Sequence, residues 1–381
     1  MQIQAWLTLP SNRQLINKRA MMIAENNVEY DPAYSDRLLV DSVANNASAQ
    51  TSPQTIESAV APLARYHLAH QHYYPLDSES SHDMVSADTR RVNIEYQHPS
   101  LAVEAAVAIV INGIHYAVLM ASPHQLEYLA VGFLFSEGLI QHSYELLDWD
   151  VIPLDDITNY QQLFHDPSTQ SLIDDNSPDK NIESSALAQD LTQLQDYDIY
   201  LVNLTISQRC HQRIQAQRRQ LAGRTGCGMC GITGLTQALP DLSAYHRHDI
   251  QQVDTSRPSL DYLLNIRQQV DVMQHTHQLT GAVHAAATLH KQQLYLFEDV
   301  GRHNALDKLI GWQLRHNIKI SCVVMTSRLS IELVQKSIRG RIPWLIGMSA
   351  PTSTAVRVAE RYNLGLAGFL RDDRVTYYTG H

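Results

Sequence analysis

The stretch KISCVVMTSRLSIELVQKSIRGRIPWLIGMSA (Lys319–Ala350) decides the fold class, because two apolar runs flank a segment with helical spacing. The first run predicts a strand over 320–326, the middle segment a helix over 331–338, and the second run a strand over 344–348. Strand, helix and strand in this order are typical of an α/β sheet.

The alternation extends outward from this unit. The further elements that we expect, in chain order, are a helix over 260–277, strands over 282–289 and 293–297, a helix over 304–314, a helix over 353–362 and a strand over 366–370. Polar or glycine-rich residues stand at the junctions 298–303, 327–330 and 349–352. Ligands of α/β sheets bind beyond the carboxyl ends of the strands, where helix N-termini offer unpaired N–H groups to anions. This half of the chain is therefore the expected ligand platform.

The N-terminal half predicts a second sheet. The run VEAAVAIVINGIHYAVLM (Val103–Met120) reads as two buried strands joined by an Asn112-Gly113 hairpin turn. A core helix over 125–136 follows and ends at Gly138. Further predicted elements are strands over 150–154 and 199–206, a basic helix over 208–221, and short helical hints at 13–25 and 54–70.

These patterns divide the chain into four parts. We expect an N-terminal extension, partly disordered, over 1–100, and an α+β subdomain over 101–222 that carries an acidic insertion at 155–198. A glycine-rich loop and linker cover 223–257, and a second subdomain covers 258–381.

Charge is distributed unevenly among these parts. The 381 residues have a formal net charge of −10, but residues 1–140 carry −7, residues 141–200 carry −12, and residues 201–381 carry +9. A basic C-terminal half indicates an anionic ligand, and the acidic stretch is typical of solvated surface.

Several classes of protein are excluded or disfavoured. A hydrophobic fraction of 44% is too high for a wholly disordered chain, and no apolar run reaches the roughly 18 residues of a membrane-spanning helix. The first twenty residues lack a small-residue cleavage site, which disfavours a secreted protein. Four cysteines are too few for a disulfide framework in a chain of this length. We expect a cytoplasmic protein with free thiols and neither a membrane nor a nucleic-acid partner.

Cys227 and Cys230 form the most specific local motif, within a segment that has glycines at 223, 226, 228 and 231. A structural zinc site needs four ligands, and Cys210 and Cys322 are solitary in the sequence, so zinc stays the less favoured alternative in which histidines complete the site. Two loop cysteines without a role are the ordinary explanation, although an exposed thiol is a liability. A redox pair or a sulfur carrier remains: in the second, a mobile thiolate accepts sulfur as a persulfide and delivers it to a partner. The residues alone favour these two equally.

Five ordered motifs closely resemble the FdhD family of formate dehydrogenase accessory sulfurtransferases. They are AGRTGCGMCG (222–231), LTGAVHAA (279–286), EDVGRHNALDKLIG (298–311), TSRLSIELVQKS (326–337) and SAPTSTAVRVAE (349–360). The stretch at 110–140 is also similar, so that the likeness covers roughly 101–381, apart from the acidic insertion.

The resemblance implies a function. A member of this family takes sulfur from a cysteine desulfurase as a persulfide and passes it to the molybdenum cofactor, Mo-bis(molybdopterin guanine dinucleotide), which is required for formate dehydrogenase activity. Motif matching makes Cys227 the persulfide carrier and Cys230 its partner thiol. A homodimer is also implied. The alternative is a chaperone that binds this cofactor for formate dehydrogenase without an obligatory persulfide relay.

The expected cofactor-binding residues lie in the C-terminal half. The family's cofactor segment matches Phe369, Leu370, Arg371, Asp372, Asp373 and Arg374, and we add Arg302 and Arg328 at the strand-to-helix junctions. Guanidinium groups offer paired donors to the phosphate oxygens of such a ligand.

The family's C-terminal part is similar in fold to cytidine deaminases, which implies an α/β, three-layer subdomain. Those zinc enzymes need a His, a Glu two residues later, and a Cys pair. Here His303 is followed by Ala305 at the Glu position, and Ser327 and Ser330 stand at the cysteine spacing. We therefore expect a zinc-free scaffold with no intrinsic metal.

Other polar residues have ordinary explanations. His284 in an Ala-rich stretch is more often a core histidine than a functional one. Asp307 and Lys308 would balance the charge of their own helix, Glu137 would be a polar helix end, and Ser330 would be an N-cap.

Overall fold

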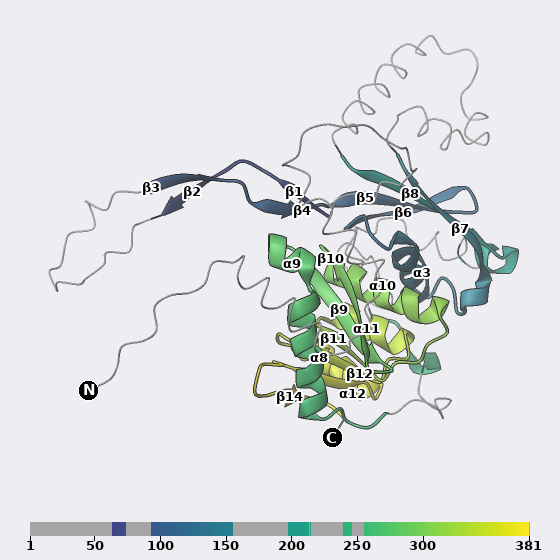
Figure 1. Cartoon of the computed structure of the whole chain (residues 1–381). Helices are drawn as coiled ribbons and strands as arrows, with labels where there is room; N and C mark the ends of the chain where they lie inside the picture. The colour runs from purple at the N-terminus through teal and green to yellow at the C-terminus, as the bar shows by residue number, and fades with distance from the viewer. Residues whose placement is uncertain are drawn as a thin grey trace, which may run out of the picture. The chain divides into compact units, whose positions relative to one another are not determined.

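The computed structural model describes residues 63–73, 93–154, 197–212, 214, 239–245 and 255–380 (Figure 1). The described residues, apart from 291–293, belong to one compact unit, and every contact discussed below lies within it. The boundaries expected at 101, 223 and 258 stay predictions.

A four-stranded sheet forms the N-terminal half. β5 (Ala105–Ile111) and β6 (Ile114–Ala121) are antiparallel, and β8 (Ile199–Ile206) pairs parallel to β5 and antiparallel to β7 (Leu146–Pro153). Asn112 and Gly113 both have positive φ, 48° and 79°, which a two-residue I′ hairpin turn requires. The predicted hairpin is therefore confirmed, whereas β7 begins earlier than the strand that we expected over 150–154.

Helix α3 (Leu126–Ser136) covers one face of this sheet with an apolar surface that includes the fully buried Leu129 and Leu134. The chain leaves the helix through Gly138 at φ 76°, a conformation that glycine adopts without a steric penalty. The predicted core helix and its glycine end are confirmed.

A six-stranded sheet forms the C-terminal half, in the order β10-β9-β11-β12-β13-β14. The strands are β9 (His284–His290), β10 (Gln293–Asp299), β11 (Cys322–Met325), β12 (Trp344–Gly347), β13 (Gly365–Gly368) and β14 (Thr376–Tyr377). β11, β12 and β13 are parallel, while β9 and β14 are antiparallel to their neighbours. The alternation of the sequence thus produces the predicted α/β fold.

Helices cover both faces of this sheet. α8 (Leu260–Met273) packs Leu263, Ile266 and Val270 onto one face. The other face is covered by α10 (Arg302–Arg315), α11 (Ile331–Arg339) and α12 (Ser353–Arg361), whose core continues into that of α3 and the four-stranded sheet. This arrangement makes the C-terminal half three-layered, as expected.

Helices α3 and α10 cross so closely that two glycines are required. A Cβ atom on Gly132 would lie 1.8 Å from the carbonyl oxygen of Asp307, and one on Gly311 would lie 1.9 Å from that of Tyr128. Close backbone approach is one of the roles that only glycine fills. This crossing joins the two halves of the described chain.

Two expectations are corrected. The helix expected over 260–277 is two helices, because the chain turns at Gln274 and α9 (His275–Thr280) begins there. The Glu298 carboxylate accepts hydrogen bonds from the N–H groups of Thr276 and His277 at 3.1 and 2.9 Å, which stabilises the new helix start.

The helical hint at 54–70 is also wrong where the structure describes it. β1 (Ala64–Tyr66) pairs with β4 (Ser100–Ala102), and β2 (Ala69–Tyr73) pairs with β3 (Asn93–Gln97). Pairing with residues 20 to 38 positions away overrides the local spacing. The hint at 13–25, the basic helix beyond residue 214 and residues 155–196 of the insertion lie outside the described residues.

Candidate anion site at the carboxyl edge of the sheet

The carboxyl ends of β11, β12 and β13 meet at one edge of the six-stranded sheet. Backbone bonds join the segments that follow them: Leu329 donates to the Ala350 carbonyl at 3.1 Å, and Phe369 donates to that of Ser349 at 3.2 Å. Ala285 N donates to the Thr326 Oγ1 at 2.9 Å, which places the start of β9 at the same edge. The fold therefore gathers the strand-to-helix junctions that the sequence indicated.

Arg302, Arg328 and Arg371 bring three positive charges to this edge. Arg302 is the first residue of α10, Arg328 follows β11 and is exposed, and Arg371 is exposed after β13. Among the described residues none of the three guanidinium groups has a hydrogen-bond or ion-pair partner, and the Arg302 Nε atom is buried without one. A buried unpaired donor costs roughly 1–3 kcal/mol, so this arrangement is suited to an anion.

His284 lies among these charges. Burial lowers the pKa of His284, and the positive charges of Arg302, His277 and Arg328 lower it further. His284 is half-buried at the start of β9, so the core histidine that we expected instead borders the arginines. A neutral imidazole can donate one hydrogen bond and accept another.

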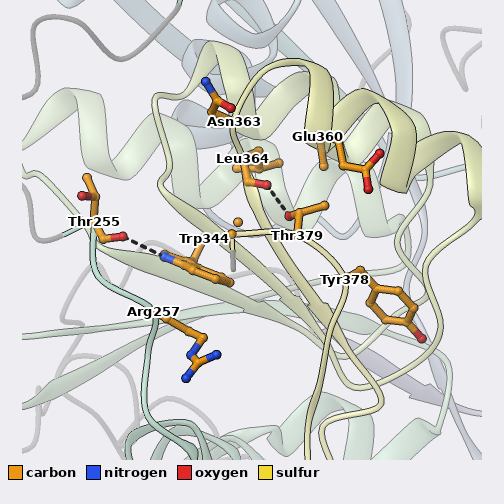
Figure 2. Close-up of a pocket in the computed structure, with 11 residues that line it drawn as sticks. Thr255, Arg257, Trp344, Glu360, Asn363, Leu364, Tyr378 and Thr379 are labelled. Carbon is orange, nitrogen blue, oxygen red and sulfur yellow. Dashed lines mark hydrogen bonds between the residues drawn. The ribbon is translucent and has the colours of Figure 1, made fainter.

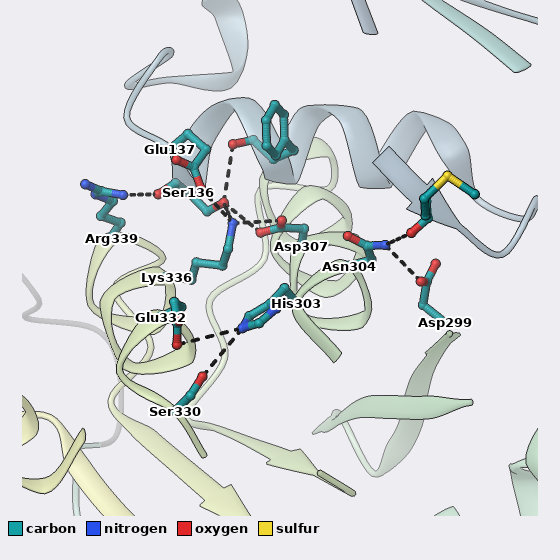
Figure 3. Close-up of polar contacts among 12 residues, drawn as sticks. Ser136, Glu137, Asp299, His303, Asn304, Asp307, Ser330, Glu332, Lys336 and Arg339 are labelled. Atoms are coloured by element: carbon teal, nitrogen blue, oxygen red, sulfur yellow. Dashed lines mark hydrogen bonds and ion pairs between the residues drawn. The ribbon is translucent and has the colours of Figure 1, made fainter. Parts of the chain in front are cut away.

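The nearest carboxylates are engaged elsewhere. Asp299 is fully buried and pairs with Lys308 at 2.7 Å, and its other oxygen accepts from Gly301 N at 2.8 Å. The same oxygen accepts from Asn304 Nδ2 at 3.0 Å (Figure 3). Because Asp299 is saturated in this way and Glu298 binds α9, neither neutralises the arginines. The charge balance that we expected within α10 is corrected for Lys308, which bonds to another element.

Asp307 also bonds outside its own helix. Lys336 on α11 reaches Asp307 Oδ2 at 2.9 Å, Glu137 Oε1 at 3.2 Å and Ser136 Oγ at 2.7 Å (Figure 3). Burial alone would lower the pKa of Lys336, but the Asp307 and Glu137 carboxylates outweigh it and raise that pKa. Glu137 is therefore more than a polar helix end, since it helps to fix α11 against α3.

His303 stands between this network and the anion site. Its Nε2 lies 3.5 Å from Ser330 Oγ and 4.0 Å from Glu332 Oε2 (Figure 3). Burial lowers the pKa of His303 to about 4, and the charges of Lys336 and Arg302 contribute. Ser330 holds the predicted N-cap position of α11, although its side chain makes no capping bond.

The predicted cofactor segment forms the loop between β13 and β14. Leu370 is fully buried in the core, whereas Arg371, Asp372, Asp373 and Arg374 are exposed. Arg374 Nη1 lies 3.3 Å from the Asp373 carboxylate in an exposed pair. The cofactor contacts assigned to these residues, Leu370 included, stay predictions.

Phe369 has an unusual backbone for an aromatic residue. Its φ is 54°, and 40% of its surface is exposed. Left-handed backbone at a bulky residue is uncommon and tends to occur at functional sites. The exposed ring is available for stacking.

The structure describes two of the four cysteines, and its described residues also bear on whether a metal site is present. Cys227 and Cys230 lie outside the described residues. Cys210 and Cys322 are buried, and burial raises the pKa of Cys322 to about 12. In the part of the chain that the structure describes, no group of three or more His, Cys, Asp or Glu side chains could hold a metal ion. No described helix is long and apolar enough to span a membrane.

A separate pocket of about 360 Å³ lies at the opposite edge, beside the starts of β12 and β13 (Figure 2). Its lining includes Thr255, Arg257, Trp344, Glu360, Asn363 and Tyr378. Trp344 Nε1 donates to the Thr255 carbonyl at 3.1 Å and forms part of its wall. None of the site residues expected from the sequence lines this pocket.

The fold and site define an α/β protein with a three-layer C-terminal half and a cation-lined sheet edge. Residues 102–381 match the FdhD/NarQ family, and the chain belongs to that family. Two proteins named sulfur carrier protein FdhD are similar. The one from Shewanella oneidensis is 36% identical, and the one from Variovorax paradoxus is 34% identical; each alignment covers 73% of this chain and 84% of the relative.

A solved structure supports the fold. The crystal structure of a candidate formate dehydrogenase accessory protein from Desulfotalea psychrophila aligns with a TM-score of 0.51 and 16% identity. The alignment covers 84% of this chain and 98% of that one. At this identity the likeness concerns the fold alone.

Sequence reasoning missed two residues near this edge, His277 and Arg267. His277 contributes to the field around His284, and Arg267 bonds to the predicted cofactor loop. His277 lies at the edge of the LTGAVHAA motif and could have been noticed there. Arg267 stands inside a helix with no motif, so no local signal indicated it.

Proposed function

We propose that this protein is a sulfur carrier for formate dehydrogenase. In this proposal a cysteine desulfurase transfers sulfur to Cys227, and the persulfide is passed to Mo-bis(molybdopterin guanine dinucleotide) as substrate. The names of the relatives support the role of sulfur carrier. Localisation in the cytoplasm and a homodimer are part of the same proposal.

The observation that carries the proposal is the set of unpaired arginines at one sheet edge. Arg302 and Arg328 lie beside His284, and Arg371 belongs to the β13–β14 loop. A ligand with two pyrophosphate groups needs several cations that internal carboxylates do not neutralise. Phe369 would stack on a guanine base beside them.

In this proposal both cysteines take part in the transfer of sulfur. The Cys230 thiolate attacks the inner sulfur of the Cys227 persulfide, the S–S bond breaks, and hydrosulfide leaves for the molybdenum. A Cys227–Cys230 disulfide forms, and an external thiol reductant later reduces it to the two thiols. An external thiol can replace Cys230 as the attacking group, but nothing replaces Cys227 as the carrier, so in this proposal the first cysteine is indispensable and the second assists.

Mass spectrometry tests the relay. The full-length protein is incubated with a cysteine desulfurase and L-cysteine, and we expect one added sulfur on the Cys227 peptide. Buried Cys322 is an internal control, because its protonated thiol should gain none. Absence of the Cys227 adduct while a guanine nucleotide still binds would favour the chaperone that needs no relay.

Two variants separate the relay from dithiol redox chemistry. Formate dehydrogenase activation should fall further for Cys227→Ala than for Cys230→Ala. Equal loss in both variants would favour an oxidoreductase. For the ligand, GDP binding should weaken in Arg328→Ala and stay unchanged in Arg357→Ala, since Arg357 is an exposed arginine of α12.

A further inference from the structure

Arg267 on α8 bonds twice to the loop between β13 and β14. Its Nη1 donates to the Leu370 carbonyl at 2.7 Å, and its Nε donates to Asp372 Oδ1 at 2.9 Å. The Arg267 side chain is 15% exposed, whereas that of Asp372 is 88% exposed. One nearly buried guanidinium therefore fixes two points of a solvent-facing loop.

These bonds complete a set of anchors around the loop. The Leu370 side chain is fixed in the core next to α8, and Arg371 N donates to the Arg374 carbonyl at 2.9 Å. With Leu370 and Asp372 both held by Arg267, the backbone of Arg371 between them is restrained from either side. The Arg371 side chain remains exposed toward solvent.

Arg267 also changes the electrostatics of the loop. Asp372 is adjacent to Arg371 in the chain, and a free carboxylate there would compete with an anionic ligand for that guanidinium. Because Asp372 pairs with Arg267, Arg371 keeps its charge available. Asp271 lies farther from Arg267 Nε, at 3.8 Å.

We propose that Arg267 is a positioning residue for the anionic ligand: it holds the β13–β14 loop through Leu370 and Asp372 so that Arg371 faces the ligand. This inference rests on the proposed function, because it assumes that the loop binds the guanine dinucleotide cofactor. Arg267 itself does not touch the ligand. Asp372 acts through the same contact.

A purely stabilising role predicts a different pattern. An ion pair with an exposed partner contributes about 0–1 kcal/mol to stability, so the pair adds little to folding. Misplacement of a binding group by about 1 Å, in contrast, can cost two orders of magnitude in function. Loss of Arg267 should therefore change ligand affinity more than thermal stability.

Calorimetric titration of the full-length protein with GDP tests this. We expect Arg267→Met to weaken GDP binding about tenfold, which corresponds to about 1.4 kcal/mol, with the melting temperature nearly unchanged. Asp372→Asn should weaken it less, and the double variant should be no worse than Arg267→Met alone. Asp271→Asn is the matched control and should bind as the wild type does.

Two outcomes would overturn the proposal. The first is unchanged GDP affinity in Arg267→Met. The second is a larger loss in Asp372→Asn than in Arg267→Met, since that would show that Asp372 touches the ligand. Arg267→Lys should recover part of the affinity, because a lysine can replace one of the two bonds but not both.

Hydrogen exchange separates failure of this inference from failure of the proposed function. Without any ligand, Arg267→Met should exchange the amides of residues 370–374 faster than the wild type does, while α8 keeps its protection. If the wild type binds no GDP but the exchange result holds, the proposed ligand is wrong and Arg267 still orders the loop. Unchanged exchange in this segment would refute the positioning role directly.

Discussion

Asp299 is the last residue of β10, and Asp307 lies in the first half of α10. The two carboxylates bind different lysines. Asp299 neutralises Lys308 from within the core, and Asp307 joins Lys336 on another helix. Removing one partner of a buried ion pair costs about 3–5 kcal/mol, because the other charge is left without compensation. Both acids are therefore committed to structure, which leaves Arg302 unopposed.

His303 makes the stability of the protein depend on pH. Its pKa is about 4 in the folded chain, against about 6.5 in an unfolded one. Between these values the unfolded chain binds more protons, so stability is lost as pH falls below 6.5. At pH 5 the loss from this residue should be about 2 kcal/mol.

Urea unfolding at pH 7.5 and pH 5.0 checks this value. His303→Gln should lose less stability between the two pH values than the wild type, and His72→Gln, at an exposed position of β2, should lose as much as the wild type. An equal loss in His303→Gln and the wild type would contradict the low pKa.

At the scale of elements, the crossing of α3 and α10 tolerates no added atom. Gly132→Ala places a methyl group within 1.8 Å of the Asp307 carbonyl oxygen, so the helices must separate. We expect a loss of about 3 kcal/mol or more, at the upper end of the cost of overpacking. Thermal unfolding measures it.

Gly340→Ala is the matched control for this substitution. Gly340 has φ −66°, and its nearest neighbours would lie 3.3 Å from a new Cβ. We expect a much smaller change there. Similar losses at Gly132 and Gly340 would show that the crossing is not the critical feature.

The elements themselves were largely predictable, because their signals are local. The Asn112-Gly113 turn and the strand-helix-strand pattern of 319–350 appear in the structure at nearly the expected residues. The break at Gln274 was not predictable, since the carboxylate that stabilises it belongs to Glu298, more than 20 residues later. The strand pairs β1–β4 and β2–β3 were not predicted for the same reason, because their partners lie far apart in the sequence.

The candidate site was predictable in part. Arg302 and Arg328 stand at strand-to-helix junctions, which sequence patterns reveal. The role of Arg267 depends on Asp372, 105 residues away, and the engagement of Asp299 depends on Lys308 and Ser122. Such pairings follow from packing, and no spacing within the sequence expresses them.

At the scale of the whole molecule, charge is segregated along the chain. The net charge of −10 masks +9 in residues 201–381, and the three unpaired arginines lie in that part. Binding of an anion there should weaken with salt, because screening shortens the reach of charges from about 10 Å at 0.1 M salt to about 3 Å at 1 M.

GDP titrations between 0.05 and 0.5 M salt test this expectation, with affinity falling by roughly an order of magnitude. Arg328→Ala should bind more weakly at low salt and show a shallower dependence. Affinity that is independent of salt would mean that the edge is not the binding surface.

Ala305 limits what can be built into this scaffold. It is fully buried in the core between α10 and its neighbours. Replacing it with glutamate would insert a carboxylate into close-packed hydrocarbon. Ala305→Glu should therefore destabilise the fold, so that an acid can be introduced at this position only with redesign of the surrounding core.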